Sequence, residues 1–406
     1  MNSINHIIYL SYDGICDPLG QSQILPYLFG ISKNSKYKIT IISFEKTKNY
    51  KLNRDLINKK IKEYNIHWIP LKYTKRPPII STVWDLYKLN NALKKLMNKR
   101  IDLIHCRSYI TSLLALKLKK SQNIPFIFDM RGFWADERVD GKLWNKNKFP
   151  FNKIYSFFKN KEKEFLEKAE YSISLTSNGK KEINSWPLKN QSPISVIPCC
   201  TDDNLFKKEN IKNVRKDIGF DDDDFIISYV GSIGTWYMLD EMLDFFKEFL
   251  NKKPNAKFLF ITKDEPNLIF EKALLKEIDT KTIKIQPSPR EMMPSYIGAC
   301  DYSIFFILPV FSKKASSPTK MGEIMNLGIP VICNAGVGDV DEIMNECMPE
   351  LLIKEFTKNE YQRVIDLIVN DYKPNQKSII ETSNNHYSLE KGIQKYKEVY
   401  KSILGV

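Results

Sequence analysis

Short runs rich in β-branched and aromatic residues alternate along the chain with longer stretches whose apolar residues recur at helical spacing. This alternation is typical of buried parallel strands joined by helices. In the first half the pattern predicts strands over 6–12, 38–44, 66–71, 101–108, 124–130, 171–177 and 194–198. Between them it predicts helices over 23–32, 82–99, 110–120, 152–169 and 178–186.

The alternation begins again near residue 224, after a polar stretch over 198–224 that is typical of a hinge. The second set predicts strands over 224–232, 257–262, 283–288, 302–307 and 330–334, with helices over 238–251, 267–277, 290–299 and 318–327. We therefore expect an α/β protein of two Rossmann-like, doubly wound domains, 1–200 and 201–385, with a ligand cleft between them. The last segment, 386–406, predicts one amphipathic helix.

Composition narrows the class of protein. The 406 residues are too many for one core and fit two domains. Seven scattered Cys and four His show no metal-binding spacing, so we expect free thiols in a cytoplasmic protein and no metal. No apolar run reaches the ~20 residues that span a bilayer. The amino terminus also lacks a signal-peptide pattern.

Charge is distributed unevenly. Residues 1–200 contain 35 Lys and Arg against 16 Asp and Glu, whereas the remainder contains 27 against 32. Such a split indicates that one half faces something anionic, such as nucleic acid or a membrane surface. No zinc-finger or RNP-like motif supports nucleic acid. An alternative explanation of the positive charge is a source proteome that is rich in Lys and Asn throughout. It does not explain why the second half of the chain is acidic.

The opening loop, "YDGICDPLGQSQ" over 12–23, separates the first strand from the first helix. Gly20 would allow close backbone approach to a phosphate, and Gln21 to Gln23 would present free amides at a helix start. Pro26 would then fall in the first helical turn. An ordinary structural turn explains the loop equally well.

The stretch "ASSPTKMGEIMNLGIPVICN" over 315–334 contains the strongest helix start in the chain. We expect Ser317 as N-cap, Pro318 at N1 and Gly328 as the terminator. Lys320 at N3 opposes the helix dipole, which indicates an anion there. Glu323, one turn on, is suited to accept hydrogen bonds from a vicinal diol. The alternative is an ordinary ion pair between Lys320 and Glu323.

Two more loops follow predicted strands of the first half. In "FDMRGFWADERVDG" over 128–141, Arg131, Asp136 and Glu137 lie beside Phe133 and Trp134, a mixture suited to bind sugar hydroxyls and rings. The alternative is a surface loop with internal salt bridges. In "DLIHCRSY" over 102–109, Arg107 is the better functional candidate, since a lone His105 at a strand end is usually structural.

The stretch 72–100 combines aromatic and basic residues. Its helix pattern places Val83, Leu86, Leu93, Leu96 and Met97 on one face, with Trp84 and Tyr87 close to it. Trp favours the lipid headgroup zone, and basic residues favour anionic lipids. We predict a membrane or acceptor contact, and the basic residues assigned to it are Lys72, Lys75, Arg76, Lys94 and Lys95. The alternative is a Rossmann helix that buries its apolar stripe.

Four motifs, in this order, resemble the family-4 retaining glycosyltransferases of GT-B fold: "YLSYDGICDPLGQSQILPYL", "FDMRGFWADERVDG", "YVGSIGTWYMLDEML" and "SPTKMGEIMNLGIPVI". The resemblance covers nearly the whole chain, and "IPCCTDDNLF" is similar to the family's interdomain stretch. It implies a nucleotide-sugar donor in the second domain, an acceptor in the first, and no bound metal or other cofactor. It also implies a final helix that crosses back onto the first domain.

The resemblance assigns residues by motif position. Glu323 matches the second glutamate of the family's E-x7-E signature, which holds the donor ribose, but Ala315 stands at the first glutamate. After the strand before Gly231, where relatives carry an Arg and a Lys for the diphosphate, this chain has Ser232 and "GTWYM". These losses place the diphosphate on Lys320.

The resemblance implies a hexosyltransferase that builds cell-surface polysaccharide such as lipopolysaccharide. Its donor would be a UDP- or GDP-sugar, and its acceptor a glycan or polyprenyl-diphosphate glycan at the inner membrane face. We assign catalysis to Lys320, Arg107, Arg131, Asp136 and Glu137. The donor-binding assignment comprises Gly20, Gln21, Gly231, Ser232, Ser316, Ser317, Thr319, Lys320 and Glu323. A sugar-nucleotide epimerase or hydrolase, a glycan phosphorylase and an inactive partner subunit are the alternatives.

Overall fold

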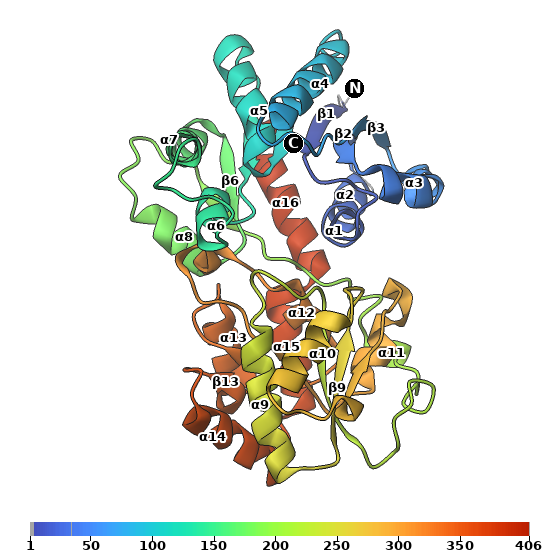
Figure 1. Cartoon of the computed structure of the whole chain (residues 1–406). Coiled ribbons are helices and arrows are strands. Elements are labelled where there is room, and N and C mark those ends of the chain that lie inside the picture. Colours follow the sequence, from blue (N-terminus) through green and yellow to red (C-terminus); the bar gives the residue numbers. More distant parts are fainter. Residues whose placement is uncertain (1–3, 34, 406) are drawn as a thin grey trace. The chain divides into compact units, whose positions relative to one another are not determined.

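The computed structural model describes residues 4–33 and 35–405, and it divides into two compact units (Figure 1). The first unit comprises Met1–Pro198 together with Leu389–Val406, and the second comprises Cys199–Ser388. Each unit contains one sheet in which all paired strands are parallel. The predicted α/β class with two Rossmann-like sheets is confirmed.

The sheet of the first unit has seven strands in the order β3-β2-β1-β4-β5-β6-β7. These strands are β1 (Asn5–Ser11), β2 (Tyr37–Glu45), β3 (Ile66–Lys72), β4 (Leu103–Arg107), β5 (Phe126–Asp129), β6 (Tyr171–Ser174) and β7 (Ile194–Val196). Its helices are α1 (Pro18–Gln23), α2 (Leu25–Ser32), α3 (Thr47–Ile61), α4 (Ile80–Leu96), α5 (Ser108–Gln122), α6 (Trp134–Asp140), α7 (Phe151–Lys168), α8 (Ser177–Asn184) and α16 (Leu389–Leu404). The strand order reverses between β1 and β4, which is where ligands bind in open sheets of this kind.

The helices of the first unit cover both faces of this sheet. The chain runs from β1 to β3 in one direction and then from β4 onward in the other, so right-handed crossovers place the helices that connect β1 to β3 on one face and the helices that connect β3 to β7 on the other. Accordingly α2 packs against α16, whereas α4 contacts α5 and α5 contacts α7. The helices α4, α5 and α7 therefore form one layer.

The sheet of the second unit has six strands in the order β10-β9-β8-β11-β12-β13. They are β8 (Phe225–Val230), β9 (Ala256–Ile261), β10 (Ile283–Ile285), β11 (Tyr302–Phe305), β12 (Val331–Asn334) and β13 (Leu352–Ile353). The helices are α9 (Leu239–Lys252), α10 (Asn267–Leu275), α11 (Met293–Gly298), α12 (Thr319–Asn326), α13 (Val340–Cys347), α14 (Lys358–Val369) and α15 (Gln376–Tyr387). Short 3-10 turns η1 (Lys208–Asn210), η2 (Thr280–Thr282), η3 (Arg290–Met292), η4 (Phe311–Ala315) and η5 (Pro349–Leu351) connect several of them.

The stretch 198–224, expected as a hinge, is largely packed into the second unit. Phe206, Val214, Ile218 and Phe220 belong to its hydrophobic core. Their spacing is irregular because the segment is mostly turns, so no helical or strand period marks them as buried. The polar residues that indicated a linker lie between these four buried side chains.

The helix α16 is a component of the first unit. It buries Tyr396, Val399 and Tyr400, and the hydroxyl of Tyr396 donates to Asp129 Oδ2 over 2.9 Å. Ile393 lies where a Cβ on Gly30 of α2 would be, only 2.1 Å away, so α2 and α16 approach closely. The last helix of the chain therefore forms part of the hydrophobic core of the first unit.

Candidate functional site

The loop after β8 and the first turn of α12 meet at one lysine. Gly231, just past the end of β8, has φ +114°, and a Cβ there would lie 3.0 Å from Lys320 Nζ. The Lys320 ammonium donates to the Tyr229 hydroxyl over 3.1 Å and lies 3.6 Å from the centroid of the Tyr237 ring. Gly231 is therefore required both for its backbone conformation and for the space that Lys320 occupies.

Lys320 is buried, with 8% of its surface exposed. Burial holds the pKa of Lys320 well below its ordinary value, and the charge of Glu323 opposes this shift only in part. Among residues 4–33 and 35–405, no carboxylate lies within ion-pair distance of its ammonium, so the expected alternative of an ion pair with Glu323 is wrong. Because folding has already removed most of the water around Lys320, little further desolvation of this donor is needed when an anion binds to it.

The start of α12 differs from the prediction in detail. Pro318 is the N-cap and no side chain caps the helix, so Lys320 occupies N2 rather than N3. Ser317 is not the cap, because its hydroxyl accepts the N–H of Cys199 over 3.1 Å. Pro318 has no N–H, and the donors that the first turn offers are the amides of Thr319 and Lys320. Gly328, at φ +73°, follows the end of the helix as expected.

Glu323 pairs with Arg290, a residue that the sequence interpretation did not single out. Arg290 Nη1 lies 3.1 Å from Glu323 Oε1, and its guanidinium lies 5.2 Å from the centroid of the Phe206 ring. Burial raises the pKa of Glu323, and Arg290 is the main group that opposes this shift. Because nothing in the sequence links Arg290 to α12, only the fold could bring the two together. We name Gly231, Arg290, Lys320, Glu323 and the first turn of α12 the α12 site.

The remaining residues assigned to the donor lie around this site. Ser316 and Thr319 are half-buried at its rim, and Ser232 is exposed while its carbonyl accepts the Tyr229 hydroxyl over 2.6 Å. Ala315 is buried at 1% exposure, within η4. The position at which the family's first glutamate would stand is therefore part of the packing of this chain.

The opening loop is ordered by its own unit. Glu45, at the end of β2, accepts the N–H groups of Ile15 and Cys16 over 2.9 and 3.1 Å. A Cβ on Gly20 would lie 2.2 Å from Gly14 O, so this glycine allows α1 to pack onto the loop. The backbone N–H of Gln21 donates to Asp17 O over 3.0 Å, since α1 begins at Pro18, five residues before the expected start at residue 23. The expectation of a free backbone amide at Gln21 is wrong, and the assignment of Gly20 to the donor stays a prediction.

Four titratable residues gather where β4 and β5 end, and we name His105, Arg107, Asp129 and Arg131 the β4–β5 cluster. All are buried or nearly so, and Asp129 Oδ1 lies 3.9 Å from Arg131 Nη1. Burial alone would raise the pKa of Asp129, but Arg131 and His105 hold it below its ordinary value. His105 Nδ1 bonds the Tyr400 hydroxyl over 2.7 Å, and burial lowers the pKa of the imidazole.

The two arginines of this cluster differ in their surroundings. Arg107 Nε lies 3.3 Å from Asp13 Oδ2 and thereby braces the opening loop. Arg131 has φ +58°, a conformation that is uncommon outside Gly and is often found at functional sites. The sequence interpretation included both arginines but missed Asp129, which ends the strand directly before the loop.

Asp136 is a structural anchor, which corrects its expected place beside an acceptor. It lies on α6 rather than in a loop, and it accepts from Tyr155 and Lys159 of α7, each over 2.8 Å. Trp134 packs between Trp144 and Phe158, and Phe133 is fully buried, so neither ring presents an open face to a sugar. Glu137 is half-buried on the same helix, and its role stays a prediction.

Helix α4 has two distinct apolar faces. Leu89, Leu93 and Leu96 are buried, as the Rossmann-helix alternative requires. Val83, expected in that stripe, is instead 62% exposed, together with Trp84 at 53%. Lys72, Lys75 and Arg76 precede this exposed face, whereas Lys94 and Lys95 lie in the last turn, ~15 Å along the axis from Trp84.

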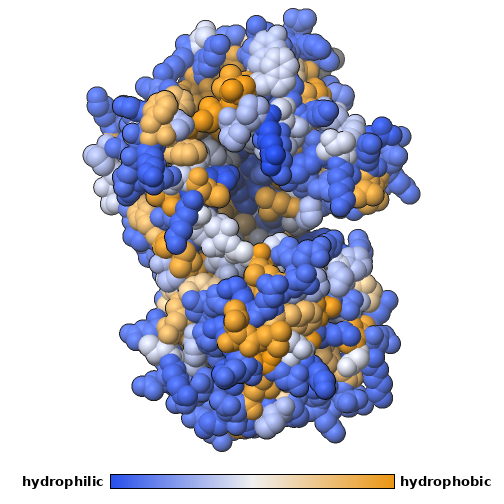
Figure 2. Space-filling model, viewed as in Figure 1, coloured by the Kyte–Doolittle hydropathy of each residue, from blue (hydrophilic) through white to orange (hydrophobic). Residues whose placement is uncertain are grey.

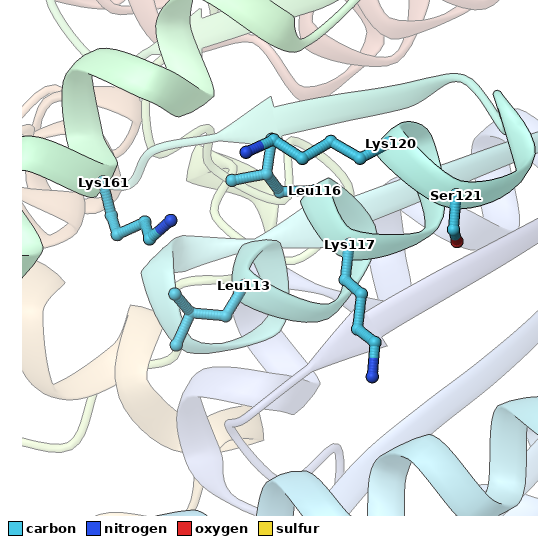
Figure 3. Close-up of a pocket in the computed structure, with 6 residues that line it drawn as sticks. All are labelled: Leu113, Leu116, Lys117, Lys120, Ser121 and Lys161. Carbon is cyan, nitrogen blue, oxygen red and sulfur yellow. The ribbon is translucent and has the colours of Figure 1, made fainter.

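A pocket of about 330 Å³ lies between α5 and α7 (Figure 3). The close-up shows Lys120 and Lys161 extending toward the same space, while Lys117 points away. Both Lys120 and Lys161 form ion pairs with Glu164. Their charges are thus largely compensated, and the pocket offers no obvious anion site.

Residues 4–33 and 35–405 contain neither a metal-binding cluster nor a helix able to span a membrane. No group of three or more His, Cys, Asp or Glu is arranged to hold a metal ion. No helix in that part combines the length and apolarity needed to cross a bilayer.

Comparison with family models assigns both halves of the chain. Residues 34–205 match the model described as Glycosyltransferase Family 4, and residues 210–386 match that described as Glycosyl transferases group 1. Comparison with curated protein sequences gave no match.

Solved structures share the fold at low identity. Sucrose-phosphate synthase from Thermosynechococcus elongatus is 16% identical with a TM-score of 0.74, covering 99% of both chains. The Anabaena protein HepE, solved with UDP and glucose, is 12% identical with a TM-score of 0.68, covering 98% of this chain and 100% of that one. A putative UDP-N-acetylglucosamine 2-epimerase from Listeria monocytogenes is 14% identical with a TM-score of 0.59, covering 99% of this chain and 96% of that one. With both halves matched by adjoining family models and the fold shared, the chain is a glycosyltransferase and belongs to the family-4 type with GT-B fold.

Proposed function

We propose that this glycosyltransferase moves a sugar, with retention of anomeric configuration, from a UDP- or GDP-sugar to a hydroxyl of a glycan or lipid-linked acceptor in cell-surface polysaccharide synthesis. The observation that carries the proposal is Lys320. It is a buried ammonium beside Gly231, without a carboxylate partner among the described residues, in the first turn of α12. A helix start with such a cation suits a diphosphate.

In the proposed reaction the bond between the anomeric carbon and the diphosphate oxygen breaks through an oxocarbenium-like state, and negative charge grows on the leaving diphosphate. Lys320 and the amides of Thr319 and Lys320 stabilise this charge. Glu323, oriented by Arg290, accepts hydrogen bonds from the ribose. The acceptor hydroxyl attacks from the same face and gives its proton to the leaving phosphate, so no protein base and no metal is required.

The first experiment is a thermal-shift screen with UDP, GDP, ADP and their sugars, which identifies the donor. The Lys320→Ala variant is then assayed with that donor. Loss of one preorganised donor of this kind costs ~3 kcal/mol, so turnover should fall a hundredfold or more. Near-normal turnover would refute the role of Lys320, and unchanged turnover in a metal chelator is expected.

Two alternatives remain open to direct test. An epimerase or hydrolase would consume the nucleotide-sugar without an acceptor, so an assay without acceptor distinguishes it from a transferase. The similarity in fold to the Listeria protein makes this control necessary. An inactive partner subunit would bind none of the nucleotides in the screen.

We further propose that the exposed face of α4 contacts an anionic membrane surface, so that the protein is cytoplasmic and peripheral at the inner face. Support comes from Val83, Trp84 and Tyr87, which are exposed on one face of the helix, and from Lys75 and Arg76 before it. Amphipathic helices with aromatic and basic residues of this kind lie in membrane interfaces. Equal binding of the protein to neutral and anionic vesicles would contradict this proposal.

A further inference from the structure

A second exposed apolar element of the first unit lies between α6 and α7. In the segment 141–150, Phe149 is 82% exposed and Leu143 is 54% exposed. The segment is anchored by Trp144, which packs against Trp134 and Phe151. The anchored tryptophan holds the segment in place while the two apolar side chains on either side of it face solvent.

The charge around these side chains has one sign. Residues 141–161 contain six Lys and no Asp or Glu. Lys142, Lys146, Lys148 and Lys153 are exposed, and in the described residues none of the four forms an ion pair. The other two face inward, where Lys159 pairs with Asp136 and Lys161 pairs with Glu164. The exposed part of the segment is therefore cationic without compensation.

The segment lies at the same end of the helix layer as the exposed start of α4. In a parallel sheet each connecting helix begins at the carboxyl edge of the strands, so α4 and α7 start at the same edge. Both belong to one layer, with α5 between them. Two helix spacings correspond to ~20 Å. Phe149, next to the first turn of α7, and Ile80, in the first turn of α4, thus lie at one end of the same layer.

We propose that the segment 142–149 is a second membrane-contact element, which binds an anionic bilayer with Leu143 and Phe149 in the headgroup zone and the lysines against anionic lipids. The inference rests on the proposed membrane association and adds a second contact point to it. A protein partner is less well matched, because the two apolar side chains are separated by lysines and form no continuous patch. A bilayer accepts such isolated anchors.

Exposure by itself does not mark a membrane contact on this protein. On the face drawn in Figure 2, hydrophobic side chains reach the surface in both units, and several lie together at the centre of the lower one. Leu275 on α10 is 84% exposed and Leu274 is 63% exposed, close to the values of Phe149 and Leu143. These two leucines lie in the acidic half of the chain, and the neighbouring Lys272 and Lys276 pair with Asp240 and Asp244, so they provide a matched control without uncompensated cations.

The test uses the full chain and vesicles of phosphatidylcholine with or without phosphatidylglycerol, with binding measured by co-sedimentation. The double variant Leu143→Ala with Phe149→Ala should bind anionic vesicles about tenfold more weakly than the wild type, because two inserted apolar side chains are lost. The control variant Leu274→Ala with Leu275→Ala should bind as the wild type does. All three proteins should show the same thermal midpoint and the same shift with the nucleotide that stabilises the wild type.

The outcomes separate this inference from the proposed function. If Val83→Ala with Trp84→Ala abolishes vesicle binding and the segment variant binds normally, the second contact is refuted and the first stands. If the wild type binds neutral and anionic vesicles equally, both are refuted. If the segment variant keeps vesicle binding but changes the oligomeric state in gel filtration, the segment is a protein interface and the inference fails.

Discussion

The α12 site and the β4–β5 cluster use buried charge in opposite ways. In the second unit, the Lys320 ammonium rests against Tyr229 and Tyr237 and has no carboxylate partner among the described residues. In the first unit, Arg107 and Arg131 lie beside Asp13 and Asp129, and the carboxylate of Asp129 also accepts from Tyr396 of α16.

This difference indicates that the α12 site binds an anion, whereas the β4–β5 cluster holds the backbone in position. Aromatic rings attract a cation only weakly compared with a carboxylate, so Lys320 retains most of its capacity for an anion. The β4–β5 cluster is already compensated, and its charges maintain the conformation of the strand ends. We therefore expect changes in the α12 site to alter nucleotide affinity and changes in the β4–β5 cluster to alter stability.

The largest effect is expected for Gly231→Ala. Its φ of +114° is strained for Ala by about 1–3 kcal/mol, and the new Cβ would also meet Lys320. Unfolding experiments and nucleotide titration should therefore both show a loss. Gly234→Ala is the control, since Gly234 has φ +149° in the same loop but no atom within 4 Å, so it should lose stability and keep nucleotide affinity. Equal loss of affinity in both variants would show that Lys320 is not involved.

Arg290→Gln is expected to weaken nucleotide binding by about tenfold. Glu323 would lose the cation that opposes the rise of its pKa on burial, and hydrogen bonds to charged groups contribute about 1.5 kcal/mol. A 2′,3′-dideoxynucleotide, which has no ribose diol, should bind equally to the variant and the wild type. Arg290→Lys should restore part of the affinity. An equal loss for the dideoxynucleotide would mean that Arg290 does not act through Glu323.

Tyr396→Phe tests the positioning role and should lower the free energy of unfolding by about 1 kcal/mol, because the buried Asp129 loses one donor. Nucleotide affinity should not change. Tyr64→Phe removes a hydroxyl from the same unit at a half-buried ring stacked on Phe29, and it should leave stability unaltered. A change of nucleotide affinity in Tyr396→Phe would contradict the separation drawn above.

The smallest effect concerns pH. Burial lowers the pKa of Lys320 from its ordinary 10.5, whereas a bound diphosphate would raise it again. Binding therefore takes up a proton once the free lysine is deprotonated, and affinity should fall a few-fold as pH rises toward 10.5. Tyr237, whose pKa burial raises to about 12, stays neutral across this range. Calorimetric titration should show this slope in the wild type and not in Lys320→Ala.

The hydrophobic pattern was sufficient for the fold but not for all of its elements, and it predicted none of α13, β13, α14 and α15. Buried parallel strands are nearly continuous in apolar residues, so each predicted strand overlaps an observed one. Helix α3 was missed because it buries only Ile57 and Ile61 among Lys and Asn residues. Helix α6 was expected as a loop, since its short sequence is dominated by charged residues on both faces.

The candidate site was predictable only where its residues share one local element. Lys320, Glu323 and the position of α12 follow from Pro318, Gly328 and dipole preference within one stretch of sequence, although Ser317 is not the cap. Arg290 and Asp129 act through partners far along the chain, and no local signal marks them. Gly20 was expected to allow close approach to a phosphate. In the structure its missing side chain allows α1 to pack against the backbone at Gly14 and Ile15.

The packing of α16 has a consequence for synthesis on the ribosome. Residues 199–388 form a continuous unit and can fold as soon as they emerge, whereas the unit that is translated first still lacks Tyr396 and Tyr400 at that time. The earliest part of the chain is therefore the last to reach its native state. Until Leu389–Leu404 have been synthesised, Asp129 lacks its hydrogen bond to the Tyr396 hydroxyl and His105 lacks its hydrogen bond to the Tyr400 hydroxyl.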